Sequence, residues 1–392
     1  GLYDSLIVVI PSLDIVVARA GQSWKREKDA EHYEVLRPFL TPIARSPLSP
    51  RGRGVGGEGI GSPHAPREDR HHAERDAYHA SPVIAGIDWA PPETIIRLAK
   101  GSDNWPLTWG ADDLLYTAYG DGRGFEPFVP KKLSLGLARI SGSPPEIRGE
   151  NILAPTVEAI GDGKRARKAS GMLMLEDGTL YMFVRNVANS QLGWSSDQGR
   201  TWEWADWKFE TSFGCPTFLN FGRANAGNRD EYAYVYSHDS DSAYERADRM
   251  ALARVPQDLL REKAAYEFFV KRDDAGAAVW TSEIARRGTV FENPRACYRS
   301  SVVYNAPLKR YLWCQTGAGD DTRFAGGFAI YDAPEPWGPW TVAYRTEQWD
   351  VGPGESSGIP AKWISPDGLT FWLVFSGDDC FSVRKGMLRR KP

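Results

Sequence analysis

The chain has 392 residues, a formal net charge of -3 at pH 7 and an aromatic content of 12%. This length allows two or three domains with large cores, and the small net charge gives no global field that would recruit nucleic acid. No run of 18 apolar residues is present, so we expect no membrane-spanning helix. The 39 glycines, 27 prolines and 15 tryptophans favour many short strands and turns.

Residues 1–44 begin with two apolar runs, Leu6–Ile10 and Ile15–Ala18, on either side of a turn at Pro11. These runs predict a strand pair, which a helix over 31–44 follows. No basic segment precedes the first run, so we predict no signal peptide. The stretch resembles the C-terminal tail of penicillin-binding-type serine hydrolases. It has none of that family's Ser-x-x-Lys, Tyr-x-Asn or Lys-Thr-Gly elements, so we interpret it as a truncated remnant without activity.

Residues 45–81 are rich in arginine, glycine, proline and histidine. A segment of this composition cannot bury enough apolar surface to fold, so a disordered linker is predicted. Its glycines do not form a phosphate loop, because no strand precedes them and no helix-forming run follows at once.

From residue 82 onward the sequence repeats a unit of three strands, and the second strand is rich in aromatic residues. We expect the first strands at 105–109, 171–175, 216–219, 301–304 and 359–363, the second at 115–119, 180–184, 232–236, 311–314 and 371–375, and the third at 133–140, 192–195, 250–255, 327–331 and 381–388. Five units in about 300 residues predict an all-β, five-bladed β-propeller over residues 82–392. A six-bladed alternative would need a blade within 257–290, but Leu259–Val270 has a helical bias and is interpreted as an insertion.

Residues Ser195–Trp202 match the Asp-box pattern Ser-x-Asp-x-Gly-x-Thr-Trp. This pattern is typical of a tight hairpin in propellers, here after the third strand of the second unit, on the outer side. Asp197 should accept backbone N–H groups within the turn, and Gly199 should supply its positive φ. Because its carboxylate is occupied in this way, we expect Asp197 to have no catalytic role.

In a propeller, side chains before the first strands and after the second strands converge at one mouth of the central channel. The candidates at these positions are Asp103, Asp121, Lys168, Arg185, Asn186, His238, Asp239, Arg299, Gln315, Glu355 and Asp378. Asp103 and Asp121 flank one predicted hairpin and would face the same pocket. Two carboxyl groups are what glycoside hydrolysis requires. The alternative is that both aspartates cap turns.

The other candidates carry two alternatives each. Lys168, Arg185 and Arg299 would suit a carboxylate of an acidic substrate, or they pair with Glu355, Asp239 and Asp378 in a structural network. Three tryptophans would stack on sugar rings or belong to the core: Trp105, Trp109 and Trp363.

His238 would be the general base of a lyase, or a histidine satisfied by hydrogen bonds at a strand end. We predict no metal site and no cofactor. A calcium site at 239–241 or 320–321 is the alternative, although both clusters lack the glycine and glutamate of a calcium loop. The four scattered cysteines, Cys215, Cys297, Cys314 and Cys380, favour free thiols over disulfides.

Three segments carry a resemblance to a known family: Trp105–Trp109 with Tyr116–Gly122, Tyr234–Ser237 with Ala251–Pro256, and Ala333–Trp340. Over residues 93–392 they resemble the five-bladed propeller proteins that include bacterial endo-arabinanases. Most members of that family have no assigned activity. The resemblance implies a propeller in which two aspartates at the first blade act on a glycan, and these correspond to Asp103 and Asp121.

We therefore expect a carbohydrate-active enzyme, a glycoside hydrolase that cleaves a polysaccharide at the propeller mouth. The alternatives are a lyase acting on a uronate-containing glycan and a non-catalytic glycan-binding propeller. A sialidase is disfavoured, because the early Arg-Ile-Pro element is missing. The expected partner is a glycan, acidic in one reading, with no nucleic acid and no membrane. A monomer in an extracellular or periplasmic compartment is expected from the class.

Overall fold

The computed structural model describes residues 6–10, 15–19 and 79–392, the last range without 162, 318 and 320. The chain divides into two compact units, Gly1–Pro66 and Arg67–Pro392.

The described part of the first unit is a strand pair. Strands β1 (Leu6–Ile10) and β2 (Ile15–Arg19) pair in antiparallel fashion, with Val8 opposite Val17. The two predicted apolar strands are thus confirmed. The helix predicted at 31–44 and most of the linker predicted at 45–81 lie outside the described residues.

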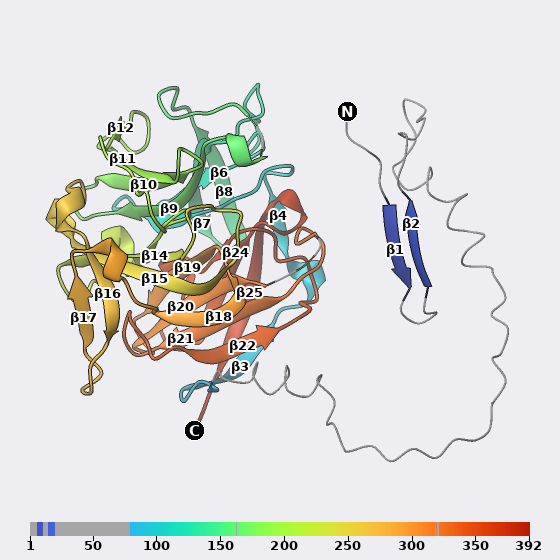
Figure 1. Ribbon diagram of the computed structural model, residues 1–392. Coiled ribbons are helices and arrows are strands. Elements are labelled where there is room, and N and C mark those ends of the chain that lie inside the picture. The colour runs from blue at the N-terminus through green and yellow to red at the C-terminus, as the bar shows by residue number, and fades with distance from the viewer. Residues whose placement is uncertain (1–5, 11–14, 20–78, 162, 318, 320) are drawn as a thin grey trace, which may run out of the picture. The chain divides into compact units, whose positions relative to one another are not determined.

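The described residues of the second unit form five antiparallel sheets that succeed one another along the chain, and one parallel pairing between first strands joins the third sheet to the fourth (Figure 1). The first sheet contains β5 (Leu107–Trp109), β6 (Leu115–Tyr119), β7 (Gly136–Ser143) and β8 (Glu146–Ile152). The second contains β9 (Lys168–Met174), β10 (Leu180–Arg185), β11 (Ser190–Ser195) and β12 (Glu203–Trp204). The third contains β13 (Thr217–Asn220), β14 (Tyr232–His238), β15 (Ala247–Pro256), β16 (Glu267–Arg272), β17 (Ala278–Thr281) and β18 (Phe291–Cys297).

Two further sheets complete the unit. The fourth contains β19 (Ser300–Asn305), β20 (Arg310–Thr316), β21 (Phe328–Ala333) and β22 (Thr341–Thr346). The fifth contains β23 (Ser357–Gly358), β24 (Thr370–Phe375), β25 (Phe381–Arg390), β3 (Ile84–Trp89) and β4 (Ile96–Leu98). Short 3-10 helices occupy connections at η2 (Pro92–Thr94), η3 (Gly163–Arg165), η4 (Arg223–Asn225), η5 (Gln257–Leu259), η6 (Lys263–Ala265), η7 (Ile284–Arg286), η8 (Ala361–Trp363) and η9 (Gly377–Asp379).

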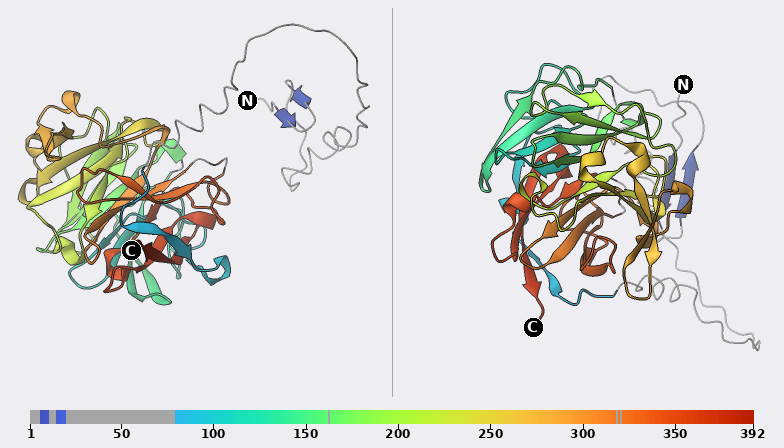
Figure 2. Two further views of the ribbon diagram at one scale, coloured as in Figure 1. Left: turned by 90° about the horizontal axis from the view of Figure 1, so that it is seen from below. Right: turned by 90° about the vertical axis from the view of Figure 1, so that its left-hand side faces the viewer.

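The buried apolar side chains show that these sheets form a closed ring. Within the described residues they fall into five clusters, and each cluster joins two sheets that are consecutive around the ring. One cluster joins the fifth sheet to the first, through Val374 and Leu115 among others. The right-hand view of Figure 2 shows the sheets following one another around the ring in chain order, from cyan through green and yellow to red. The predicted five-bladed β-propeller is therefore the fold, and the five sheets are its blades.

The second strands are largely apolar because both of their faces are buried, and several of their polar residues lie at their ends. Along β20, Tyr311 and Trp313 pack toward blade three, whereas Leu312 and Cys314 pack toward blade five. Side chains alternate between the two faces of a strand, so a strand between two neighbouring blades needs apolar residues on both faces. This requirement explains why the second and third strands were predicted within a few residues of their observed bounds.

The ring closes where the N-terminal strand of the propeller joins the last blade. Strand β3 pairs with β25, so that Asp88 lies opposite Met387 (Figure 1). Before this strand, the backbone of His79 and of Ser81 bonds with that of Val342 at 2.9 and 2.8 Å. These bonds hold residues 79–81, the end of the predicted linker, against blade four.

One predicted strand and one predicted helical segment of the propeller are wrong. The first strand of blade five is β23 at 357–358, and the predicted segment 359–363 instead contains the 3-10 helix η8. Pro360 has no N–H group to donate to a neighbouring strand. The helical bias of 259–270 produces only η5 and η6, after which β16 begins at Glu267. The buried rings of Phe268 and Phe269 hold this strand in blade three.

The 195–202 turn joins β11 to β12 on the outer side of blade two, as predicted. Asp197 accepts hydrogen bonds from the backbone of Arg200 and Thr201 at 3.1 and 2.8 Å, and from the Thr201 hydroxyl at 2.6 Å. Gly199 has φ 88°. Burial opposes ionisation of Asp197, but the bonds from Thr201 and Ser195 lower its pKa below the usual value. The carboxylate is fully engaged within the turn.

The four cysteines are buried and free, which confirms the thiol interpretation. Among the described residues, the helices are all too short or too polar to cross a bilayer.

Candidate active site

The first strands of the blades line the central channel side by side, so their N-terminal ends lie at the same mouth of the channel. Strands β13 and β19 pair in parallel, for example at Leu219 and Val302. Each second strand runs antiparallel to its first strand and ends at the same mouth. A cavity of about 460 Å³ lies there, lined by Gly101, Asp103, Asp121, Lys132, Asp321, Arg323, Glu355 and Asp379. The predicted convergence of distant residues at the mouth therefore holds for Asp103, Asp121 and Glu355.

Asp103 lies beside the end of β6. Its backbone exchanges two hydrogen bonds with Gly120, of 2.9 and 2.7 Å, so it is held next to the residue that precedes Asp121. The carboxyl atom Oδ1 is buried and has no hydrogen-bond partner among the described residues. Burial raises the pKa of Asp103 to about 6; Lys168 opposes this shift, and Glu355 and Asp121 add to it. Asp103 can therefore hold a proton in mildly acidic solution.

Asp121 follows β6 in the left-handed region, at φ 45°. Its Oδ1 lies 2.5 Å from Nζ of Lys168, and the lysine side chain is 3% exposed. Lys168 is the first residue of β9 in the next blade. The ion pair between blades one and two presents Asp121 as a carboxylate beside the protonatable Asp103.

Gly120 leaves the space in which these groups meet. A β-carbon at this position would lie 2.7 Å from Oδ1 of Asp103 and 3.3 Å from Nζ of Lys168. A contact of 2.7 Å is closer than real β-carbons allow, so a side chain at residue 120 would displace the Asp103 carboxyl. The glycine is needed for close approach.

Glu355 supplies a third carboxylate to the mouth. It precedes β23 and forms an ion pair with Nη1 of Arg299, the residue before β19. Burial opposes its ionisation, but Arg299, Arg185 and Lys168 together lower its pKa below the usual value. Glu355 is therefore an anion at neutral pH and raises the pKa of Asp103.

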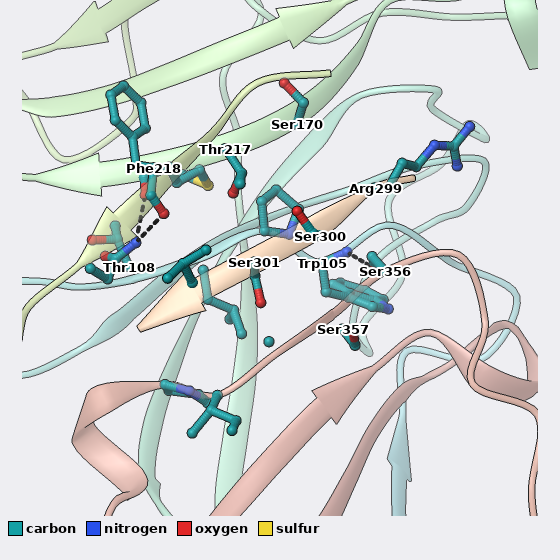
Figure 3. Close-up of a pocket in the computed structure, with 18 of the residues that line it drawn as sticks. Trp105, Thr108, Ser170, Thr217, Phe218, Arg299, Ser300, Ser301, Ser356 and Ser357 are labelled. Carbon is teal, nitrogen blue, oxygen red and sulfur yellow. Dashed lines mark hydrogen bonds between the residues drawn. The ribbon is translucent and has the colours of Figure 1, made fainter. Parts of the chain in front are cut away.

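Below the mouth, the first strands enclose the central channel, whose free volume is about 50 Å³. Figure 3 shows the small polar side chains of Thr217, Ser301 and Ser357 in this region, with Arg299 at one end of β19 and directed away from them. Ser356 accepts a hydrogen bond of 2.9 Å from the backbone N–H of Trp105. The channel holds no more than a few water molecules, so a polysaccharide would have to bind at the mouth.

The structure does not favour the alternative of a lyase base for His238. Its side chain is fully buried, Nε2 lies 2.7 Å from the carbonyl oxygen of Ser242, and the residue does not line the 460 Å³ cavity at the mouth. Burial lowers the pKa of His238 to about 4; the Ser242 hydrogen bond opposes this shift. The imidazole is neutral and hydrogen-bonded through Nε2 at the end of β14, whereas its buried Nδ1 has no partner among the described residues.

The tryptophans do not form sugar platforms at the mouth. Trp105 is 2% exposed, donates to the Cys380 carbonyl at 2.9 Å and packs against the ring of Phe381. Trp363 is 4% exposed in the same core cluster. Trp109 lies at the other end of β5, where it donates to Asp113. The prediction of substrate stacking is therefore wrong for Trp105 and Trp363.

Two acidic candidates belong to structural networks. Asp239 is paired with Arg249 and Arg287 at 2.5 and 2.7 Å, and its side chain is 5% exposed. Asp378 lies 3.6 Å from Arg97 and does not line the 460 Å³ cavity, whereas the next residue, Asp379, does. Ion pairs thus engage both carboxylates, and substrate binding by Asp239 and Asp378 stays a prediction.

The calcium alternative gains no support from the described residues. The two arginines occupy the Asp239 carboxylate and would repel a cation. Asp321 is paired with Arg323 at 2.6 Å, and Asp320 lies outside the described residues. No group of three potential ligands occurs among the described histidine, cysteine, aspartate and glutamate residues.

The remaining polar candidates lie beside the mouth. Arg185, at the end of β10, is fully buried. Gln315 is 3% exposed in β20, and its Nε2 lacks a hydrogen-bond partner among the described residues. Asn186 donates to the Ala166 carbonyl at 2.7 Å.

Sequence reasoning missed several residues of the site. A second cavity of about 250 Å³ adjoins Asp103 and Glu355 and is also lined by Arg246, Tyr298 and Arg323. Arg246 and Arg323 lie in loops between second and third strands. Because second strands end at the mouth, these loops also begin there. Every residue of these loops, and not only the first one or two after each strand, could therefore have been considered a candidate for the site.

Comparison with known proteins found similar solved structures at low identity. A GH43_1 enzyme from Xanthomonas citri is 13% identical over 76% of this chain and 91% of its own, with a TM-score of 0.42. An α-L-arabinofuranosidase from Podospora anserina is 11% identical over 75% and 92%, with a TM-score of 0.42. The catalytic domain of a GH62 α-L-arabinofuranosidase from Coprinopsis cinerea is 10% identical over 80% and 96%, with a TM-score of 0.41. No family profile matches the chain, and no curated protein matches it.

Proposed function

We propose that this protein is a glycoside hydrolase that cleaves a polysaccharide at the propeller mouth, with Asp103 and Asp121 as the reacting pair. The observation that carries the proposal is the difference between these two neighbouring carboxyl groups. Asp103 is buried with a pKa raised to about 6, whereas Asp121 is paired with Lys168. Two carboxyl groups in different environments are suited to acid and base roles.

In this mechanism Asp103 donates its proton to the glycosidic oxygen as the bond to the leaving sugar breaks. Asp121, as a carboxylate, attacks the anomeric carbon or activates the water that does so. Both groups line one cavity, so a single bound sugar can contact both. Lys168 lowers the pKa of Asp103, whereas Glu355 raises it.

The proposed role of Asp103 requires its protonated form. We expect kcat/KM to fall as the pH rises above about 6, since the proton donor is then lost. Asp103→Asn and Asp121→Asn should each lower kcat by roughly 10² to 10⁴. The measurement is reducing-end release from arabinan, xylan and uronate-containing polysaccharides, with the exposed Asp274→Asn as the control.

Unchanged turnover in both variants would contradict the proposal. Ultraviolet absorbance from an unsaturated uronate product would identify a lyase instead. Glycan binding without any product across the pH range would identify a binding module. The proposal also includes an extracellular or periplasmic monomer, in keeping with a polysaccharide substrate.

A further inference from the structure

Three arginines and two tyrosines alternate along one side of the mouth. The guanidinium groups of Arg185 and Arg299 lie 5.3 and 4.7 Å from the ring centre of Tyr244. Those of Arg299 and Arg246 lie 4.9 and 4.5 Å from the ring centre of Tyr298. Blades two and three and the start of blade four thus contribute to one stack, which we call the arginine ladder. Each aromatic face lies against two cations and holds them in place.

The guanidinium groups of the ladder have more hydrogen-bond donors than the surrounding described residues have acceptors for them. Arg185 is fully buried, yet among the described residues its hydrogen bonds reach only Asn104 Oδ1 at 3.3 Å and the Ala169 carbonyl at 3.5 Å. Within the described residues it has no ion pair, in contrast to Lys168 and Arg299. Arg185 interacts with Glu355 and Asp103 through space without a direct ion pair to either. A buried guanidinium without such a pair is unfavourable, so an anion bound beside it would be stabilised.

The other two arginines also have N–H groups without an acceptor among the described residues. Arg299 uses Nη1 for Glu355 and Nε for the Ala243 carbonyl, and Arg246 uses Nη2 for the Gly317 carbonyl. Three buried nitrogen atoms have no partner among the described residues: Nη1 of Arg185, Nη2 of Arg299 and Nη1 of Arg246. Arginine donors in a fixed plane match the two oxygens of a carboxylate.

The ladder borders the space where the reacting carboxyls lie. Arg246 and Tyr298 line the 250 Å³ cavity together with Asp103 and Glu355. We propose that the arginine ladder binds the carboxylate of an acidic sugar next to the bond that Asp103 and Asp121 cleave. This inference rests on the proposed function for its position relative to the cleaved bond, but anion recognition itself does not require catalysis.

The test measures binding without turnover. Calorimetry at pH 7 would compare trigalacturonate with the neutral xylotriose on the full chain carrying Asp103→Asn. We expect trigalacturonate to bind at least tenfold more tightly, with an affinity that falls as salt is added. Adding Arg246→Gln should weaken trigalacturonate binding about tenfold to a hundredfold, since a charge-assisted contact is lost. Arg246 is only half-buried, so this variant avoids the folding risk of replacing Arg185.

Arg345→Gln is the matched control, because this arginine lies on β22 and pairs with Glu347; it should leave binding unchanged. Equal affinity for trigalacturonate and xylotriose would overturn the inference. So would equal affinity for inorganic phosphate and trigalacturonate, which would indicate a site for free anions. Neither result depends on hydrolysis, so failure of this inference and failure of the proposed function are distinguishable.

Discussion

At the scale of single residues, the site depends on a carboxyl group that is costly to ionise. Asp103 lies in a buried position where its Oδ1 has no partner among the described residues, and its pKa is raised to about 6 from the ordinary 3.8. Gly120 keeps the neighbouring space open for it. The same burial that makes Asp103 a candidate proton donor therefore reduces the stability of the fold at neutral pH.

The pH dependence of stability should reveal this cost. Between pH 3.8 and about 6 the unfolded chain has lost the Asp103 proton while the native protein retains it, so native stability falls as the pH rises. Asp103→Asn removes the charge and should stabilise the protein by up to about 3 kcal/mol above pH 6, with little effect near pH 3.5. Denaturant unfolding at pH 3.5 and pH 8 checks this. A variant that is less stable than the parent at pH 8 would argue against a raised pKa.

Gly120→Ala should reduce activity without preventing folding. Its β-carbon would contact Asp103 Oδ1 at 2.7 Å, and a displacement of about 1 Å at a reacting group can cost roughly a hundredfold in rate. The measurement is kcat alongside the midpoint of thermal unfolding. Gly276→Ala is the control, because it strains a residue at φ 82° with open space around it; activity should survive that change. Full activity of Gly120→Ala would show that the carboxyl position is not critical.

At the scale of elements, the local sequence predicts turns, and strands with both faces buried, more reliably than it predicts the short inner strands. The 195–202 turn is encoded by its own residues, since Asp197, Ser195 and Gly199 make the bonds that close it. Blade five shows the opposite case. Its inner strand has only two residues, Ser357–Gly358, and its pairing partner is β24. A strand this short has no period that can be detected.

Asp197→Ala should lower stability and leave activity intact. The change removes acceptors for the Arg200 and Thr201 backbone and for the Thr201 hydroxyl, which should cost roughly 1–3 kcal/mol. Urea unfolding gives the free energy, and kcat per folded molecule should match that of the parent. Asp206→Ala, on the exposed segment nearby, is the control. A large loss of kcat in folded Asp197→Ala would contradict the purely structural role of the turn.

At the scale of the whole molecule, ring closure determines whether the mouth exists. Strand β3 completes blade five and buries Ile84 and Ile87 between blades four and five. Ser81 donates to Asp332, which also pairs with the buried Arg310 at 2.7 Å. Contacts made by the N-terminal end of the propeller therefore hold blade five, with Glu355, against blade four.

Truncation should separate the parts of the chain that the ring needs. A chain of residues 79–392 should fold and keep its activity, because it retains β3 and the backbone bonds of His79 and Ser81 with Val342. A chain of residues 91–392 loses β3 and two buried isoleucines, worth about 3–6 kcal/mol, a large share of typical domain stability. Circular dichroism and thermal unfolding would compare the two. Cooperative unfolding of both chains at the same temperature would contradict closure by β3.

Near neighbours in the sequence were enough to predict the repeats, the turn chemistry and the pairing of Asp103 with the end of β6, because these depend on the period of a strand and on single hairpins. The environments of the site residues were not predictable in this way. Asp103 is influenced by Lys168 of blade two and Glu355 of blade five, and Arg185 meets Tyr244 of blade three. Burial and charge act through space, so these partners come together when the ring has closed, and the closed ring sets the charge of each group.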